Sequence, residues 1–427
     1  HATLPLEILS NGSHLVSKSQ LGAALGSLMT SKDELWKNYI VGAVHAALEQ
    51  HSVWEKRRVG EARSGLLESK LPTGVCVTVV SDVPWNAGLA SSAAVEMAVV
   101  VAMGHALKLP AEALDPIRIS SMCQEVENQV VGANCGLMDH LAVAHAQDAE
   151  KGNSSLLGFD CRLPKLAGDI ETIALPKGMS VLAVESGVER SVADPPYAQV
   201  RAASLMGFAM INDAIRKGAG DRTTPIDCLS DIPPSVFCAE YQRFLPDQIA
   251  GADFVAGMRD TLKGLTTVDP SFLYRVRAAT AHPIEEHARV LMFEAALRGL
   301  HGQHSEVARG RTHHVLGELM RQSHASYSMC GLGTSETDLL VSMLHDTPVC
   351  TSAKVIGAKI SGGGGGGALS VVVWDALKST DSLDEQAEFW KSVQAKYHLQ
   401  TGLTCKVRGG TSGKATYHGR ATREVAD

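Results

Sequence analysis

Two adjacent serines, Ser91 and Ser92, end a loop of small residues whose pattern suits the binding of an anion. Residues 82–90 contain Pro, Asn and Gly, whereas residues 93–107 are mostly Ala, Val and Met and predict a helix. The first amides of a helix lack partners inside it, and the helix dipole adds partial positive charge there. Phosphate groups bind readily at such an end. The pattern equally fits a plain N-cap, in which Ser91 or Ser92 caps a buried helix without any ligand.

Two carboxylates, Glu127 and Asp139, form the second candidate set. They flank a segment that contains two glycines, so they need not share one helix face. One carboxylate could bind a cation while the other contacts a substrate hydroxyl. The chain contains 46 acidic residues, so this spacing alone also fits two ordinary surface charges.

The elements that must position these residues alternate between strand-like and helical patterns. We expect strands over residues 75–80, 179–184 and 369–374, and helices over residues 36–48, 93–107, 120–131, 202–217 and 316–329. Residues 51–70 are rich in charge and predict a solvated connection. The small-residue loop would then lie between a strand and a helix, and Glu127 would lie on the next helix along the chain.

A third segment, residues 357–368, reads GAKISGGGGGGA. Six consecutive glycines are typical of a flexible linker. However, the strand-like residues 369–374 follow at once, which favours a tight, structured loop instead.

Composition sets limits on the class of protein. The 427 residues are 45% hydrophobic and predict two domains, and the net charge of −7 gives no reason to expect nucleic acid or an anionic membrane as partner. Nine cysteines without a Cys-x-x-Cys pair indicate reduced thiols and a cytoplasmic protein. The apolar residues 93–107 are too few for a membrane span and include Glu96 and His105. The oligomeric state stays open.

Three segments together resemble the GHMP kinases. Residues 84–94, PWNAGLASSAA, resemble the phosphate-binding motif of that family. Residues 126–139, VENQVVGANCGLMD, resemble the segment that carries a metal-binding Glu and a catalytic Asp in its arabinokinase and galactokinase branch. Residues 357–368 resemble its glycine-rich motif. Each segment is weakly specific alone, but their combination, spread from about residue 36 to about residue 413, is specific.

The resemblance implies an α+β fold of two domains. The N-terminal α/β domain would span residues 1–175 and a ferredoxin-like C-terminal domain residues 176–427. The implied cofactors are ATP and Mg²⁺, and the implied substrate is a monosaccharide. The residues that would hold the ATP phosphates are Asn86, Ala87, Gly88, Leu89, Ala90, Ser91, Ser92, Ala93, Gly362, Gly363 and Gly364.

The same resemblance implies a role for each chemical group. Ser92 and Glu127 would hold Mg²⁺, and Asp139 would be the catalytic residue that accepts or orients the proton of the attacking hydroxyl. Gly136, Asp139 and Tyr197 would contact the sugar. The reaction would be phosphorylation of a sugar, at the C1 hydroxyl of L-arabinose or a related sugar. Galactose and fucose are the alternative substrates.

Several positions depart from the pattern of the family. His140 stands where Gln is usual, Glu189 and Arg190 stand where Arg and His are usual, and Gly365 replaces a usual Ser. The first motif of the family, similar to Gly-Glu-His-x-Asp-Tyr, is not found. These departures keep two alternatives open: a non-catalytic sensor of sugar or nucleotide, and an inactive fragment that lacks the first strands of the fold.

Overall fold

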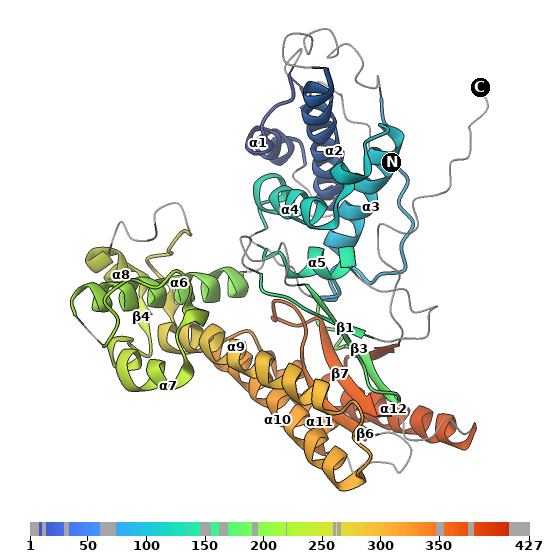
Figure 1. Cartoon of the computed structure of the whole chain (residues 1–427), viewed down its shortest axis with the longest axis vertical. Helices are drawn as coiled ribbons and strands as arrows, with labels where there is room; N and C mark the ends of the chain where they lie inside the picture. The colour runs from blue at the N-terminus through green and yellow to red at the C-terminus, as the bar shows by residue number, and fades with distance from the viewer. Residues whose placement is uncertain are drawn as a thin grey trace. The chain divides into compact units, whose positions relative to one another are not determined.

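The structure is a computed structural model, shown in Figure 1, in which the chain divides into two compact units. The described residues of the first lie within 8–85 and 90–174, and those of the second within 86–89 and 175–409. The structure describes residues 8–10, 14–29, 34–59, 74–133, 135–145, 155–161, 170–189, 195–218, 220–258, 262, 266–346, 354–374 and 380–409.

The first unit is mainly helical in its described part. Its helices are α1 (Lys18–Leu28), α2 (Trp36–Val59), α3 (Ser91–Ala106), α4 (Pro116–Val126) and α5 (Met138–His145), with a 3₁₀ turn η5 (Ala111–Leu114) and a π-helical turn η6 (Glu127–Val131). Two short antiparallel strands, β1 (Ser155–Gly158) and β2 (Glu171–Ala174), complete it.

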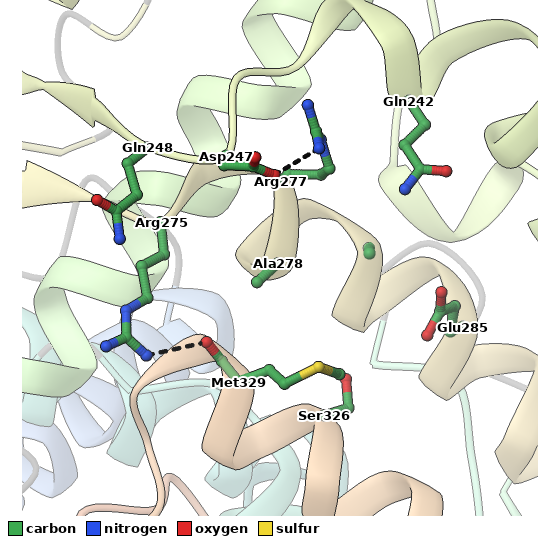
Figure 2. A pocket seen from close by; sticks show the side chains of 10 residues that line it. Gln242, Asp247, Gln248, Arg275, Arg277, Ala278, Glu285, Ser326 and Met329 are labelled. Atoms are coloured by element: carbon green, nitrogen blue, oxygen red, sulfur yellow. Dashed lines mark hydrogen bonds and ion pairs between the residues drawn. The ribbon is translucent and has the colours of Figure 1, made fainter.

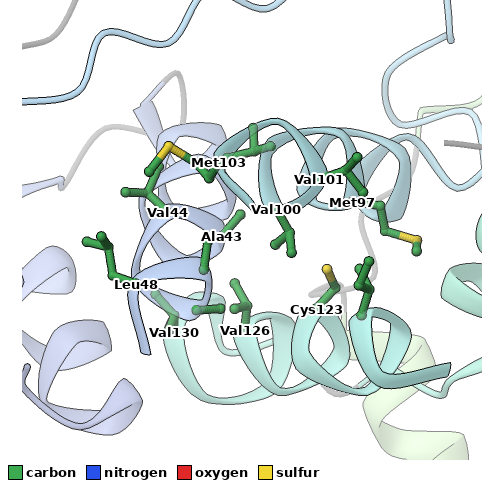
Figure 3. Close-up of a cluster of buried hydrophobic side chains, with 14 of the residues drawn as sticks. Ala43, Val44, Leu48, Met97, Val100, Val101, Met103, Cys123, Val126 and Val130 are labelled. Carbon is green, nitrogen blue, oxygen red and sulfur yellow. The ribbon is translucent and has the colours of Figure 1, made fainter. Parts of the chain in front are cut away.

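The core of the first unit lies between α2, α3 and α4. Figure 3 shows Ala43 of α2, Val100 of α3 and Val126 of α4 pointing into the space between the three helices. The backbone of α2 approaches α4 closely at Gly42, where an added Cβ would lie 2.3 Å from a methyl carbon of Val126. Burial of these aliphatic side chains supplies the main driving force for packing the three helices together.

Helix α3 begins at Ser91, two residues before the predicted start. Its N-cap is Ala90, which has a left-handed backbone (φ 56°) and no side-chain hydrogen bond to the helix. The prediction that Ser91 or Ser92 caps this helix is therefore wrong. Both serines lie inside the first turn, because the left-handed residue turns the chain into the helix one position earlier.

Two predicted elements near α3 are different in the structure. The described residues include no strand at 75–80; this segment and α3 both line a hollow of about 620 Å³. Backbone pairing, and not valine content, defines a strand, and no described strand pairs with it. Residues 51–59, predicted as a connection, instead continue α2, since charged residues such as Glu, Lys and Arg are good helix formers.

The second unit contains a four-stranded antiparallel sheet. Its strands are β3 (Met179–Glu185), β6 (Lys354–Ile360), β7 (Ala368–Trp374) and β8 (Lys406–Arg408), in the spatial order β6-β7-β3-β8. Helices connect β3 to β6, a tight loop connects β6 to β7, and α12 (Thr380–Thr401) connects β7 to β8. This is the strand order of a ferredoxin-like domain, so the predicted α+β fold class is confirmed.

Helices α11 (Ser335–Asp346) and α12 cover this sheet with apolar side chains. Leu340 and Leu344 of α11 and Tyr397 of α12 share a buried cluster with Val371 of β7. The hydroxyl of Tyr397 also donates a hydrogen bond to the carbonyl oxygen of Ser186, at 2.7 Å, just after β3. The sheet is thereby fixed beneath the two helices.

A second core in this unit draws its buried side chains from the elements α6 (Pro195–Arg216) to α9 (Val276–Gly299), and α10 (Glu306–Cys330) packs against α9. The elements between α6 and α9 are η9 (Leu229–Asp231), α7 (Pro234–Val236), η10 (Phe237–Tyr241), η11 (Gln242–Phe244), β4 (Ile249–Ala250), α8 (Gly251–Met258) and β5 (Leu273–Tyr274). Met206, Tyr241 and Tyr274 are fully buried in this core. None of the helices in the described ranges is long and apolar enough to cross a membrane.

Candidate functional site

The start of α3 places two polar side chains on one face of the helix. Left-handed backbone at Asn86, Gly88 and Ala90 bends the loop toward the helix. Ser92 and Glu96 then lie four residues apart, which puts their side chains on the same face. Glu96 is fully buried, although α3 is otherwise apolar over most of its length.

Glu127 opens the π-helical turn η6, where α4 ends. The wider turn closes with a hydrogen bond of 2.9 Å from the Ala133 amide to the Glu127 carbonyl oxygen, and Gly132 (φ 83°) ends it. The side chain of Glu127 is only 3% exposed. Such π-helical turns are frequent at functional sites.

The segment after η6 is anchored to the end of α4. The Cys135 amide donates to the side-chain oxygen of Asn128 at 3.0 Å, and the Gln124 amide group donates to the Cys135 carbonyl at 3.3 Å. Helix α5 follows and carries Asp139 and His140 in its first turn. The chain is thus folded back so that η6 and the start of α5 are neighbours.

Three residues predicted from the sequence come together here. The Glu127 carboxylate accepts hydrogen bonds from the Ser92 hydroxyl and the Cys135 thiol, and Asp139 lies near enough for their charges to interact. Burial is the main cause that raises the pKa of Glu127; the negative charge of Asp139 raises it further, and the two hydrogen bonds oppose the rise.

Two further residues beside Glu127, Glu96 and His140, were not predicted from the sequence as part of the site. Nε2 of His140 lies 3.2 Å from Oε2 of Glu96 and 3.9 Å from Oε1 of Glu127. Burial raises the pKa of Glu96 well above its usual value and lowers that of His140 to about 4. The sequence feature that could have identified Glu96 is that it is the lone acidic residue in an apolar helix, since a buried acid requires a partner.

The cluster can hold a divalent cation. Oε1 of Glu127 is buried, and no hydrogen-bond donor of the described residues reaches it. Its neighbours include the hydroxyl of Ser92 and the carboxylate of Asp139. Hydroxyl and carboxylate oxygens are the ligands that Mg²⁺ prefers, so the donor set fits that ion.

Other predicted site residues lie in the second unit. Tyr197 is half-buried in the first turns of α6, and residues 362–364 belong to the loop that joins β6 to β7. Residues 86–89 are also grouped with this unit. In the first unit, Gly136 lies between Cys135 and α5, where an added Cβ would meet no atom within 4 Å.

The glycine-rich loop is a structured turn, as the strand-like residues after it predicted. Its backbone is held by hydrogen bonds from the Tyr327 hydroxyl to the Gly362 carbonyl (2.9 Å) and from the Gly365 amide to the Leu332 carbonyl (2.6 Å). Left-handed backbone occurs at five of its glycines, Gly362, Gly364, Gly365, Gly366 and Gly367. Only glycine adopts this conformation repeatedly without strain.

The second unit also contains a hollow of about 350 Å³ that none of the predicted site residues line (Figure 2). Arg275 donates to the Met329 carbonyl at 3.2 Å on one side of it, and Arg277 pairs with Asp247 on another. Its lining mixes both signs of charge with amide groups, and no feature of it points to phosphoryl transfer.

Comparison with known proteins places this geometry in a family. Residues 38–147 match the family described as GHMP kinases N terminal domain, and this range contains Ser92, Glu96, Glu127, Asp139 and His140. The match assigns these residues a likeness to the N-terminal domain of GHMP kinases. The predicted resemblance is therefore confirmed, and the matched range contains all the residues of the cluster.

Two relatives of known function extend the similarity beyond that domain. L-arabinokinase of Arabidopsis thaliana is 31% identical over 364 residues, which cover 79% of this chain and 33% of the plant protein. A galactokinase of Chloroflexus aggregans is 29% identical over 379 residues, covering 86% of this chain and 76% of that enzyme. The chain thus spans about a third of the length of the plant relative. Both of these relatives are sugar kinases by name.

The fold agrees with that of a solved structure. The galactokinase of Lactococcus lactis, in a complex with galactose, aligns with a TM-score of 0.54 at 18% sequence identity. The alignment covers 78% of this chain and 68% of the galactokinase. At this level of identity the likeness shows the fold alone, and the activity and substrate must be argued separately.

Proposed function

We propose that this protein is an ATP-dependent kinase that phosphorylates a monosaccharide, at the C1 hydroxyl of L-arabinose or a related sugar. The GHMP kinase domain and the names of the relatives support ATP and a sugar as substrates. L-arabinose is placed before galactose and fucose because the motifs resemble those of arabinokinases and an L-arabinokinase is 31% identical over 364 residues.

One observation carries the proposal: half-buried Ser92 and Asp139 gather around the buried carboxylate of Glu127. The Ser92 hydroxyl bonds to Glu127, and Asp139 interacts electrostatically with that carboxylate. In our proposal Ser92 and Glu127 hold Mg²⁺, and Asp139 orients the attacking sugar hydroxyl and accepts its proton. Bound Mg²⁺ would supply positive charge to the phosphate oxygens; transfer of this kind depends chiefly on such charge and on positioning.

The start of α3 supports phosphate binding. Because Ala90 offers no side-chain acceptor to the first amides of the helix, a phosphate oxygen can accept hydrogen bonds from them. We assign residues 86–93 to the phosphates of ATP on this basis. Gly362, Gly363 and Gly364 are assigned to the same ligand through the family motif, and Gly136 and Tyr197 to the sugar.

The proposal is tested by measuring ADP release from Mg-ATP with L-arabinose, galactose, fucose and glucuronate. We expect release that depends on L-arabinose and falls by at least about a thousandfold in Asp139→Asn, because that variant cannot accept the hydroxyl proton. Binding of ATP, measured by calorimetry, should remain within about threefold of the wild type. If no sugar stimulates release although ATP and sugar both bind, the protein is a sensor and not a kinase.

A further inference from the structure

We propose that Glu96 is a positioning residue of this site: by engaging His140, it keeps an oxygen of Glu127 free to bind the metal ion. The inference deepens the proposed function and rests on it through the role of Glu127 as a metal ligand. Neither Glu96 nor His140 belongs to the set of residues that the family motifs imply for metal or substrate.

The distances within the cluster define the arrangement. Nε2 of His140 and Oε2 of Glu96 are hydrogen-bonded at 3.2 Å, so one proton lies between them. The same nitrogen is 3.9 Å from Oε1 of Glu127, which is too far for a hydrogen bond. His140 is therefore close to the carboxyl groups of both Glu96 and Glu127. It is hydrogen-bonded to Glu96, which has no proposed chemical role.

Because all three groups are buried, it matters for Glu127 that His140 pairs with Glu96. The exposed fractions are 0% for Glu96, 1% for His140 and 3% for Glu127, so water does not compete for these groups. In the described part of the chain, neither carboxylate forms an ion pair with Lys or Arg. If His140 lost Glu96 as its partner, Oε1 of Glu127, 3.9 Å from Nε2, would be available to pair with it, since unpaired polar groups are costly in such surroundings.

The pair also connects the two helices that carry the proposed chemistry. Glu96 follows Ser92 by one turn of α3, whereas His140 directly follows Asp139 on α5. Their hydrogen bond fixes α5 relative to α3 at the level of Glu127. Buried second partners of this kind commonly set the orientation of metal ligands.

Loss of the Glu96 carboxyl group has a specific expected consequence. Glu96→Met keeps the approximate volume but removes the carboxyl partner of His140. With a proton on Nε2, His140 would then turn to Oε1 of Glu127 and compete with the metal ion. Removal of the competitor in Glu96→Met/His140→Leu should restore binding. A purely structural role of Glu96 would predict the opposite, because the double variant loses still more polar contacts.

The experiment measures Mn²⁺ binding to the full chain by electron paramagnetic resonance, in the presence of a non-hydrolysable ATP analogue. We expect affinity about tenfold weaker in Glu96→Met, and within about threefold of the wild type in Glu96→Gln and in the double variant. Glu112→Gln, an exposed acid of η5, is the matched control and should bind as the wild type does. Circular dichroism confirms that each variant is folded.

Each result decides the inference. Unchanged affinity in folded Glu96→Met, or a double variant weaker than the single one, would overturn it. If Glu96→Met does not fold, His140→Leu alone decides: affinity at least equal to that of the wild type supports the inference, and weaker binding contradicts it.

Two further results separate this inference from the proposed function. If Glu127→Ala binds Mn²⁺ like the wild type, Glu127 is no ligand, and both the inference and the proposed metal site are wrong. If the wild type binds Mn²⁺ as expected but shows no sugar-dependent ADP release, the proposed function fails while the Mn²⁺ series still decides the role of Glu96.

Discussion

Among single residues, Glu127 has the properties that most favour a metal site. Its carboxylate is buried, receives hydrogen bonds from Ser92 and Cys135, and keeps one oxygen without a donor among the described residues. Burial of a carboxylate that is only partly satisfied is unfavourable unless a cation or proton completes its surroundings. The unpaired oxygen is therefore the feature that most favours a metal site.

Replacement of Ser92 tests this reading. Ser92→Ala removes a hydroxyl that bonds to Glu127 and that we assign to Mg²⁺, so we expect the Mg²⁺ concentration for half-maximal rate to rise about tenfold or more. Titration of the initial rate with Mg²⁺ at saturating ATP measures it. Ser121→Ala on α4, whose hydroxyl bonds only to the Ile117 carbonyl, is the control. Identical Mg²⁺ dependence in both variants would remove Ser92 from the site.

The glycine-rich loop illustrates how backbone geometry constrains an element. Gly364 and Gly365 have nearly the same left-handed φ, 73° and 76°. An added Cβ at Gly364 would lie 2.6 Å from the Leu332 carbonyl oxygen, whereas at Gly365 it would meet nothing within 4 Å. The Leu332 carbonyl cannot retreat easily because it accepts a hydrogen bond from the Gly365 amide.

A matched pair of variants measures this difference. Both Gly364→Ala and Gly365→Ala carry the cost of left-handed backbone, about 1–2 kcal/mol. Only Gly364→Ala adds a steric clash, so we expect its free energy of unfolding to be lower by a further ~2 kcal/mol. Urea denaturation followed by tryptophan fluorescence gives both values. Equal losses would show that the loop relaxes around Gly364 without cost.

The packing of α9 against α10 predicts a pH dependence of stability. His282 of α9 bonds to the Ser326 hydroxyl at 2.8 Å and stacks edge-to-face on Tyr327. Burial lowers its pKa to about 4; nearby Arg289 and Lys359 lower it as well, and Glu286 opposes them. In the unfolded chain a histidine has a pKa near 6.5. Between about pH 6.5 and 4 the unfolded state therefore binds a proton that the folded state does not.

The sign of the effect follows from proton binding. The stability associated with neutral His282 is fully present above about pH 6.5 and declines as the pH falls toward 4, by at most about 1.4 kcal/mol per unit. We expect His282→Gln to lose this part of the slope, whereas exposed His314→Gln should keep it. Urea denaturation at pH 7, 5.5 and 4.5 measures the slopes; parallel slopes for His282→Gln and the wild type would contradict the assignment.

Local pattern predicted some elements well and others poorly. Strand β3 and helix α3 follow directly from alternating or continuous apolar residues, and their sequence ranges were nearly correct. The valine-rich residues 75–80 form no strand in the described structure, because strand formation depends on a partner elsewhere in the chain. The role of Ala90 at the start of α3 was hidden for a similar reason: a left-handed alanine has no sequence signal.

The candidate site shows the same limit. Ser92, Glu127 and Asp139 were identified through family motifs. Residue chemistry alone left open whether they form a binding site or are an ordinary helix cap and ordinary surface charges. Glu96 and His140 were noted only as an interruption and a departure from the pattern. Their contact joins residues 44 positions apart and becomes visible only once α3 and α5 are packed together. Contacts of this kind depend on tertiary structure, which local sequence rules do not contain.

At the scale of the whole molecule, the residues of the proposed mechanism are spread over both units. The first unit carries Ser92, Glu127 and Asp139, and the second carries Tyr197 and the glycine-rich loop. The family profile covers residues 38–147, whereas the likeness to sugar kinases covers most of the chain. Phosphoryl transfer to a sugar is therefore a claim about the entire chain and must be tested on it.

The most direct test of that claim is phosphorus NMR of the product formed from Mg-ATP and L-arabinose. We predict a new phosphomonoester signal coupled to the anomeric proton, formed in equal amount with ADP and absent with Asp139→Asn. A signal coupled to another sugar proton would correct the position of transfer. Release of inorganic phosphate without any phosphorylated sugar would contradict the assignment of this chain as a sugar kinase.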